Sequence, residues 1–194
     1  EFIWRLCVSY RGINTVTKPF TFPIPRCDDS MDHFGSRTGR LFWICVDAKS
    51  GYHQIAVHVA SQEKLAFYLP DGSKSTWNVM PFGPTNAPAV YTCMMHQLRE
   101  EWLALFAERF PGLNPADVLI DFHLVQVGDR QIVDDILLFG NDPIVVILYF
   151  GCVCAVFVKA RLSFNPKKCE FFLKRLEWIG HDLLVDGNAP ASSK

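Results

Sequence analysis

The chain has 194 residues, of which 49% are hydrophobic and 20% are charged, and its formal net charge is -1. This composition indicates one compact globular domain with smaller lobes, because a chain of this length buries a sizeable core. The seven cysteines are odd in number and include no Cys-x-x-Cys pair, which argues against a disulfide framework and a zinc knuckle and favours reduced, buried thiols. The near-neutral charge neither supports nor excludes nucleic acid as a partner.

The first half of the chain predicts extended structure followed by a helix. Residues 1–40 predict extended segments, because their prolines prevent a long helix. Residues 41–59 predict a strand, a turn and a second strand, and residues 63–79 predict a hairpin around Pro70-Asp-Gly72. Apolar side chains at helical spacing predict a packed helix over residues 88–110.

The second half begins with residues 111–130, which leave two alternatives open: an added pair of strands, or a prolonged leader into the next strand. Asn141-Asp142-Pro143 is a helix-start signal and predicts a helix that continues to Arg161. Its uncharged stretch is shorter than the ~20 residues of a membrane helix, so we expect a buried helix and no membrane span. Residues 163–172 and 175–184 predict closing strands, and residues 187–194 predict a tail.

Two adjacent carboxylates, Asp134 and Asp135, lie inside the apolar run 131–139. Burying paired negative charge in such a run is costly unless a cation offsets it, as a divalent metal does. Because successive side chains of a strand point to opposite faces, the pattern predicts a hairpin with both acids at its turn. Asp47 ends another apolar run, and one carboxylate delivered beside that hairpin makes a site for hard ions such as Mg2+. Such a site suits two-metal phosphoryl chemistry.

The motifs around these acids have a recognisable order. They include Val46-Asp-Ala-Lys-Ser-Gly-Tyr-His-Gln-Ile55, Met80-Pro-Phe-Gly-Pro-Thr-Asn-Ala-Pro88 and Val133-Asp-Asp-Ile-Leu137, together with residues 4–14, 22–26, 162–172 and 177–181. In these segments the chain resembles the reverse transcriptases of gypsy-type long-terminal-repeat retrotransposons and, more distantly, of retroviruses. The pattern departs from the family at Ile132, where Tyr or Phe is frequent, and at Ser9, where an acid is frequent. Neither departure removes a metal ligand.

The resemblance implies an α+β fold, a right-hand polymerase palm in which helices back an antiparallel sheet, with partial fingers. It divides the chain into partial fingers over 1–40, a palm over 41–175, and a primer-grip hairpin with the start of a connection to an absent thumb over 176–194. The family's preceding fingers strands are expected to be absent as well.

The implied activity is that of an RNA-directed DNA polymerase. A primer 3′-hydroxyl attacks the α-phosphate of a deoxynucleoside triphosphate, on an RNA or DNA template. Asp47, Asp134 and Asp135 match the family's metal-binding aspartates, and the resemblance implies that Asp47 and Asp134 bridge two Mg2+ or Mn2+ ions while Asp135 assists. The bland alternative is that these acids cap turns.

The resemblance also implies roles in nucleotide binding. Arg5 would contact the triphosphate and the incoming base, and Tyr52 would lie under the sugar and disfavour a 2′-hydroxyl. The Phe82-Gly83 segment would pack beside the sugar and the template base. Lys167 or Lys168 lies near the position of a lysine that can protonate the leaving pyrophosphate. The alternatives are a surface strand for the arginine, a core position for the tyrosine and a solvated turn for the lysines.

Arg11 matches a fingers arginine near the template strand, and Trp178-Ile179-Gly180 matches the primer-gripping hairpin. The implied partners are a primed template, deoxynucleoside triphosphates and the rest of a Pol polyprotein with its thumb and ribonuclease H. The alternative function is a decayed or domesticated fragment that serves as a structural subunit, with a protein partner on the apolar helix at 144–158. No signal segment precedes Trp4, so we expect an intracellular location, in the cytoplasm, a virus-like particle or the nucleus.

Overall fold

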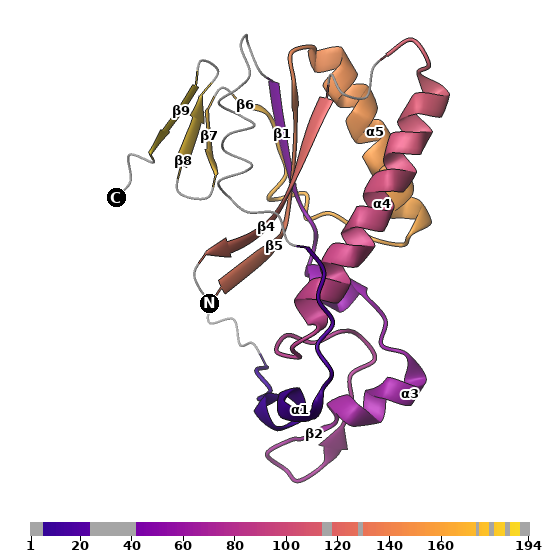
Figure 1. Cartoon of the computed structure of the whole chain (residues 1–194), viewed down its shortest axis with the longest axis vertical. Helices are drawn as coiled ribbons and strands as arrows, with labels where there is room; N and C mark the ends of the chain where they lie inside the picture. Colours follow the sequence, from indigo (N-terminus) through magenta and orange to yellow (C-terminus); the bar gives the residue numbers. More distant parts are fainter. Residues whose placement is uncertain are drawn as a thin grey trace. The chain divides into compact units, whose positions relative to one another are not determined.

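The computed structural model describes residues 6–23, 42–113, 118–127, 130–173, 175–178, 181–184 and 187–190, and it describes side chains over 6–23, 42–113 and 136–173 (Figure 1). The chain forms two compact units. Unit 1 comprises Glu1–Pro23 and Ser50–Cys93, and unit 2 comprises Ile24–Lys49 and Met94–Lys194. This division follows contacts within the chain, and the functional division into fingers, palm and primer grip stays a prediction.

Unit 2 is built on a four-stranded antiparallel sheet with the strand order β4-β5-β1-β6. The strands are β4 (Val118–Val127), β5 (Arg130–Gly140), β1 (Phe42–Asp47) and β6 (Glu170–Leu173). Residues 111–130, which left two alternatives open, supply one strand, β4, that pairs with β5 along most of its length. The added strand makes β5 an interior strand of the sheet.

The two interior strands β1 and β5 carry the core of unit 2. Every residue of β1 from Trp43 to Asp47 is buried, and so are Ile136 to Phe139 of β5. The rings of Trp43 and Phe139, which are register partners, stack with their centroids 5.0 Å apart. Unbroken apolar runs form such strands because both faces of the sheet exclude water there.

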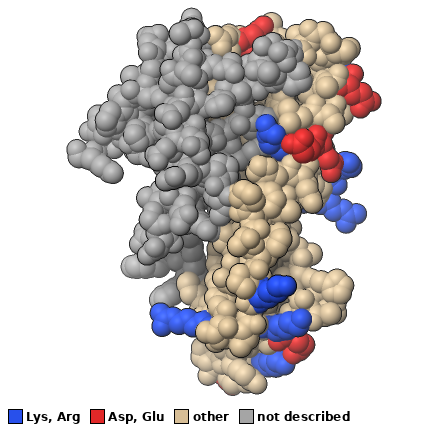
Figure 2. Space-filling view, in the orientation of Figure 1, with Lys and Arg blue, Asp and Glu red and all other residues tan. Residues whose placement is uncertain are grey.

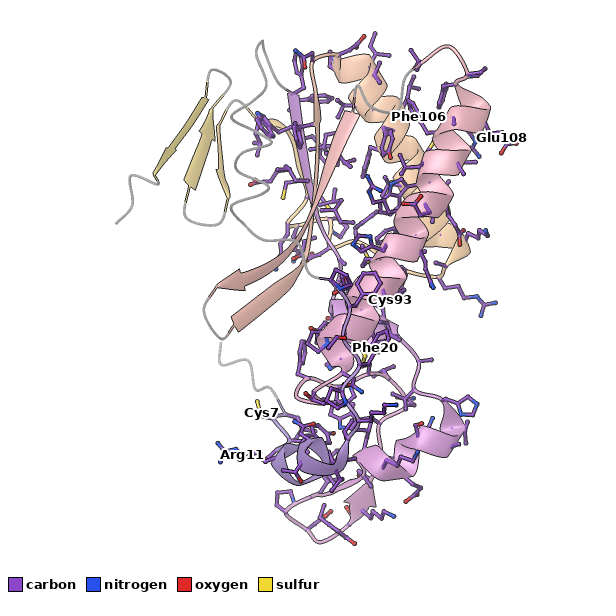
Figure 3. All side chains as sticks on the ribbon, viewed as in Figure 1. Cys7, Arg11, Phe20, Cys93, Phe106 and Glu108 are labelled. Atoms are coloured by element: carbon purple, nitrogen blue, oxygen red, sulfur yellow. The ribbon has the colours of Figure 1, made fainter. Side chains whose placement is uncertain are left out.

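Helix α5 (Pro143–Lys159) packs against this sheet, and the C-terminal part of α4 (Ala87–Arg109) packs against α5 (Figure 1). Phe106 of α4 lies 4.8 Å from Tyr149 of α5 between ring centroids, and Trp102 stacks on Phe157 at 6.3 Å. Figure 3 shows Phe106 directed from α4 toward α5. Burial raises the pKa of Tyr149, because its phenol lies within this apolar contact. The helix predicted over 88–110 is confirmed.

The start of α5 is fixed by its predicted cap. Asp142 accepts a hydrogen bond through Oδ1 from the backbone N–H of Ile144 at 2.8 Å, and Pro143 begins the helix. The helix buries one face at helical spacing, with Val145, Val146, Tyr149, Cys152, Val153, Val156 and Phe157. The expectation of a buried helix is confirmed for this face, whereas Ile144, Ile147 and Val158 are exposed. No helix in the described part of the chain is long and apolar enough to cross a membrane.

Unit 1 consists of short elements around the N-terminal turns of α4. These are α1 (Arg11–Val16), η1 (Gly51–Gln54), α3 (Val59–Gln62), η2 (Glu63–Leu65), β2 (Phe67–Tyr68) and β3 (Lys74–Ser75). The predicted hairpin is present as β2 and β3, in which Phe67 pairs with Ser75 and Tyr68 pairs with Lys74. The side chains of Lys74 and Glu63 form an ion pair that ties β3 to η2.

One prediction for unit 1 is wrong, and another is refined. The N-terminal segment contains no long helix among its described residues, as predicted, but it does contain the short helix α1, and Thr15 and the C-cap residue Thr17 donate hydroxyl hydrogen bonds to backbone carbonyls of this helix. The second strand expected within residues 41–59 is replaced by η1 and α3. Ser50 has a φ of 53°, and this left-handed residue turns the chain so that the N–H of His53 bonds to its carbonyl at 2.8 Å.

The C-terminal part of unit 2 forms a three-stranded antiparallel sheet of β7 (Arg175–Trp178), β8 (His181–Leu184) and β9 (Gly187–Pro190). The closing strands predicted over 163–172 and 175–184 correspond to β6, β7 and β8, but β9 lies where a tail was expected. The missed signal is Asp186-Gly187, because an Asp-Gly pair between extended segments favours a hairpin.

Removing the cap of α5 tests whether this helix depends on it. We expect Asp142→Ala to lower the free energy of unfolding by about 1 kcal/mol, because the Ile144 N–H loses its acceptor. Asp142→Asn keeps an acceptor and should lose less. Urea unfolding followed by circular dichroism measures both variants, and an unchanged midpoint for Asp142→Ala would contradict the assignment.

Candidate active site

Asp47 is a buried carboxylate at the end of a buried strand. It is the last residue of β1, and its side chain is 9% exposed. Among the described residues, Asp47 and Thr92 are the buried polar ones, so Asp47 is the buried acid of this set. Because an isolated buried carboxylate is costly, the position calls for a positive charge nearby.

That charge comes from Lys168. Its Nζ lies 2.9 Å from Asp47 Oδ1, and the two residues are 121 positions apart in the sequence. The sequence placed a lysine of the family at either Lys167 or Lys168, and the structure brings Lys168 to the acid. The side chain of Lys167 is exposed, and its backbone N–H bonds to Asn165 Oδ1 at 3.3 Å.

The segment that carries Lys168 is held against the end of β1 by backbone hydrogen bonds. The N–H of Asn165 donates to the carbonyl of Asp47 at 2.8 Å, and the N–H of Lys49 donates to the carbonyl of Ser163 at 3.0 Å. Asn165 then accepts a hydrogen bond from the N–H of Lys168 at 3.0 Å. These bonds fix the place from which the lysine reaches Asp47.

The structure places the backbone of the paired acids beside that of Asp47. Asp135 is the register partner of Asp47 in the antiparallel β1–β5 pair, and Asp134 is the next residue of β5 beyond the end of β1. The side chains of Asp134 and Asp135 lie outside the described side chains. Register partners on adjacent antiparallel strands have Cα atoms about 5 Å apart, so the three acids belong to one part of the sheet.

The prediction that both acids lie at a hairpin turn is wrong. The β4–β5 hairpin closes with the pair Val127 and Arg130, so the acids lie within a strand. The reason is the length of β4, because its ten residues pair with β5 well past the acids and move the turn away from them.

In unit 1, Tyr52 lies in η1 and belongs to an aromatic cluster. Its ring stacks on Phe82 with centroids 5.1 Å apart, and it meets Tyr91 at the start of α4 at 5.3 Å. Tyr52 is 7% exposed, whereas Phe82 is 57% exposed. The structure thus brings together two of the residues predicted to face the nucleotide, with the tyrosine as support and the phenylalanine facing solvent. The role of Tyr52 in sugar selection stays a prediction.

Gly83 follows Phe82 in a backbone conformation that suits glycine. Its φ is +106°, and a Cβ at this position would lie 3.0 Å from Cδ2 of Tyr10. Tyr10 is itself buried, and its hydroxyl donates to the carbonyl of Leu65 at 3.3 Å. Burial raises the pKa of Tyr10. The glycine therefore allows the loop to approach the tyrosine ring closely.

Two asparagine side chains hold this loop, and sequence analysis missed both. Asn14 of α1 donates to the carbonyl of Gly83 at 3.0 Å and accepts from the N–H of Thr85 at 2.9 Å. Asn86 accepts from the N–H of Phe20 at 2.9 Å and donates to the carbonyl of Lys18 at 3.0 Å. No local signal reveals these bonds, because they join segments more than sixty residues apart.

Of the remaining predicted site residues, the structure describes Arg11 and the backbone of Trp178. Arg11 is the first residue of α1, and its exposed side chain points away from the helix (Figure 3). Trp178 ends β7 and is the antiparallel register partner of His181 in β8, and its role in gripping the primer stays a prediction. Arg5, Ile179 and Gly180 lie outside the described residues. Among the described residues, no three His, Cys, Asp or Glu side chains come together as a metal cluster.

The described part of unit 1 carries more basic than acidic side chains. It contains Arg11, Lys18, Lys64 and Lys74 against Glu63 and Asp71, so four minus two gives a net charge of +2. Figure 2 shows basic side chains at this end of the chain on the face in view. The near-neutral charge of the whole chain therefore conceals a local excess, which favours contact with phosphates.

Comparison with known proteins identifies the class to which this fold and site belong. The sequence model of the reverse transcriptase (RNA-dependent DNA polymerase) family matches residues 3–183, so the chain belongs to that family. The retrovirus-related Pol polyprotein from transposon 412 of Drosophila melanogaster is 28% identical over 98% of this chain. The corresponding polyprotein from transposon gypsy is 23% identical over 94% of the chain. The chain spans 13% and 15% of the length of these two relatives.

Solved structures show the same fold. A foamy viral protease-reverse transcriptase in complex with double-stranded DNA superimposes with a TM-score of 0.71 at 20% identity, over 97% of this chain and 28% of the other. The native prototype foamy virus protease-reverse transcriptase gives a TM-score of 0.64 at 21% identity, over 97% and 21%. The predicted α+β class is confirmed, with antiparallel sheets and packed helices in the architecture of a retroviral reverse transcriptase.

Two glycine variants test the close approach at the Phe82-Gly83 loop. Gly72 and Gly83 both have positive φ, but a Cβ on Gly72 meets nothing within 4 Å, whereas a Cβ on Gly83 meets Tyr10. We expect Gly72→Ala to cost about 1 kcal/mol of stability from backbone strain alone. Gly83→Ala should cost ~1 to 3 kcal/mol more, because the tyrosine ring must move. Thermal unfolding measures both, and equal losses would contradict the steric role.

Proposed function

We propose that this chain is the catalytic palm segment of an RNA-directed DNA polymerase. It transfers nucleotides from deoxynucleoside triphosphates to a primer 3′-hydroxyl on an RNA or DNA template. The observation that carries the proposal is a buried carboxylate, Asp47, at the end of a central strand and in register with Asp135, within a chain of the reverse transcriptase family. A strand end of this kind holds an acid rigidly, as positioning catalysis requires.

The donor set fits divalent ions. A carboxylate that is nearly excluded from water and that already attracts an ammonium group at 2.9 Å is a strong ligand for a hard cation. We propose that Asp47, Asp134 and Asp135 hold two Mg2+ or Mn2+ ions. When bound, such ions make the attacking hydroxyl more acidic and neutralise charge on the leaving pyrophosphate.

Other residues of the chain would position the nucleotide and the primed template. Tyr52 is fixed by Phe82 and Tyr91, and a rigid ring is suited to excluding a 2′-hydroxyl from the sugar site. The loop that carries Phe82 and Gly83 is held by the amide of Asn14, so the exposed ring of Phe82 has a stable base. The basic excess of unit 1 supports contact with the phosphates of a template or primer.

The alternative of a purely structural subunit receives less support. It relied on the apolar helix at 144–158 needing a partner, but α5 buries seven of its residues within the chain's own fold. The chain spans a small part of the Pol polyproteins that it resembles. We therefore propose that it works as one segment of such a polyprotein, together with a thumb and a ribonuclease H domain.

Primer extension tests the proposed activity. The wild-type chain should extend a DNA primer on an RNA template with Mg2+ or Mn2+, and Asp47→Asn should reduce the rate by about 1,000-fold, because a charged metal ligand is lost. Asp71→Asn removes an acid from the exposed β2–β3 turn and should leave the rate unchanged. A folded wild-type chain that neither extends the primer nor binds a primed duplex in a salt-sensitive way would contradict the proposal.

Variants at Tyr52 test sugar selection. We expect Tyr52→Val to raise the use of ribonucleotides relative to deoxynucleotides by about 10- to 100-fold, as removal of a steric barrier of 1 to 3 kcal/mol implies. Tyr52→Phe retains the ring and should preserve the ratio. Competition between the two nucleotide types in single-turnover extension measures it. A ratio that stays the same in an active Tyr52→Val variant would assign Tyr52 to packing alone.

A further inference from the structure

The ion pair between Lys168 and Asp47 is strongly asymmetric. The side chain of Asp47 is 9% exposed and that of Lys168 is 64% exposed, with Nζ 2.9 Å from Oδ1. The ammonium therefore reaches from solvent to an acid that is almost excluded from water. Such a carboxylate has lost most of its hydrating water, and its negative charge is stabilised by the cation that takes the place of this water.

The other described ion pairs differ in this respect. In Lys159–Glu101 the acid is 47% exposed, and in both Lys74–Glu63 and Arg99–Glu100 it is 71% exposed. Pairs of this kind are screened by water and contribute little to stability. The contrast marks the Lys168–Asp47 pair as the one in the described part of the chain where the cation compensates a buried charge.

The arrival of Lys168 at Asp47 depends on the turn that precedes it. The carbonyl of Asp47 accepts the N–H of Asn165, and the carbonyl of Asn165 accepts the N–H of Lys168. The strand end that carries the acid thus also holds the segment that carries the lysine. These hydrogen bonds hold the backbone of Lys168 in place. Its long, flexible and exposed side chain can still leave the carboxylate.

We propose that Lys168 is the resident counter-ion of Asp47 in the metal-free protein, and that a divalent cation must displace its ammonium group in order to bind Asp47. The inference rests on the proposed function, in which Asp47 is a metal ligand. A metal ion lies about 2.1 Å from a carboxylate oxygen, so it would lie close to an ammonium on the same oxygen. Two cations at that separation repel strongly in a site with little water.

Displacement has two consequences for the chain. Without metal, Lys168 keeps the buried carboxylate compensated and the strand end folded. With metal, the energy of breaking the ion pair is subtracted from the binding energy, so Lys168 sets the concentration of divalent cation at which Asp47 becomes occupied. Lys168 is a positioning residue in this account, because it acts through Asp47.

Binding of Mn2+ to the whole chain tests displacement, with the signal of free Mn2+ in electron paramagnetic resonance as the readout. We expect Lys168→Met to bind Mn2+ about ten-fold more tightly than the wild type, because no cation has to be displaced. Lys168→Arg keeps a cation and should bind as the wild type does. Lys159→Met is the matched control, since it removes one lysine from an exposed ion pair, and its affinity should be unchanged.

Thermal unfolding with a chelator gives an independent readout. Lys168→Met should lower the melting temperature by about 3 °C and more than Lys159→Met does, because a buried carboxylate loses its counter-charge. Added Mn2+ should restore the lost stability in Lys168→Met. If that variant does not fold, Lys168→Gln keeps a hydrogen-bond donor without the charge and carries the same expectations.

The outcomes separate the two proposals. If the wild type binds Mn2+ and Asp47→Asn does not, but Lys168→Met binds no more tightly than the wild type, displacement is overturned while the metal site stands. If Asp47→Asn binds Mn2+ as well as the wild type does, Asp47 is not a ligand, and both the metal site and the displacement are overturned. Tighter binding by Lys168→Met, unaltered by Lys159→Met, supports displacement.

Discussion

The structure of unit 2 depends on one constraint, which is that a carboxylate is held at the end of a strand whose other residues are apolar and buried. Asp47 is the last residue of β1, an interior strand that pairs with β5 on one side and with β6 on the other. The apolar residues of β1 from Trp43 to Val46, which precede Asp47, are buried. A charge in such a place needs a cation, and the fold provides one by pairing the segment before β6 with the end of β1. The same requirement explains why this position is suited to a divalent ion.

The constraint also relates stability to chemistry. A site that must receive cations is easier to fold if it contains one already, and Lys168 supplies it from an exposed side chain that can leave. A lysine buried in the core would compensate Asp47 equally well, but it could not be displaced without unfolding its surroundings. An exposed lysine on a well-held turn avoids that conflict.

Unit 1 solves a different problem, because it presents an aromatic ring to solvent on a loop that contains little regular structure. Phe82 is supported from behind by Tyr52, and the loop is held by the amides of Asn14 and Asn86. Side-chain amides are suited to this task, since each can donate and accept at once and so replaces the strand pairing that the loop lacks. A glycine then permits the close approach to Tyr10.

The family, the two long helices, strand β1 and the three acids were predictable from the sequence, because these features are encoded in residues close to one another in the chain. The cap of α5 is one example, in which Asp142 bonds to a residue two positions away. Three features required the folded chain: Lys168 rather than Lys167 meets Asp47, Asp135 rather than Asp134 is its register partner, and asparagines hold the Phe82 loop. The physical reason is distance along the chain: contacts between residues as far as 121 positions apart depend on how strands pair and pack, and neighbouring residues carry no signal of them.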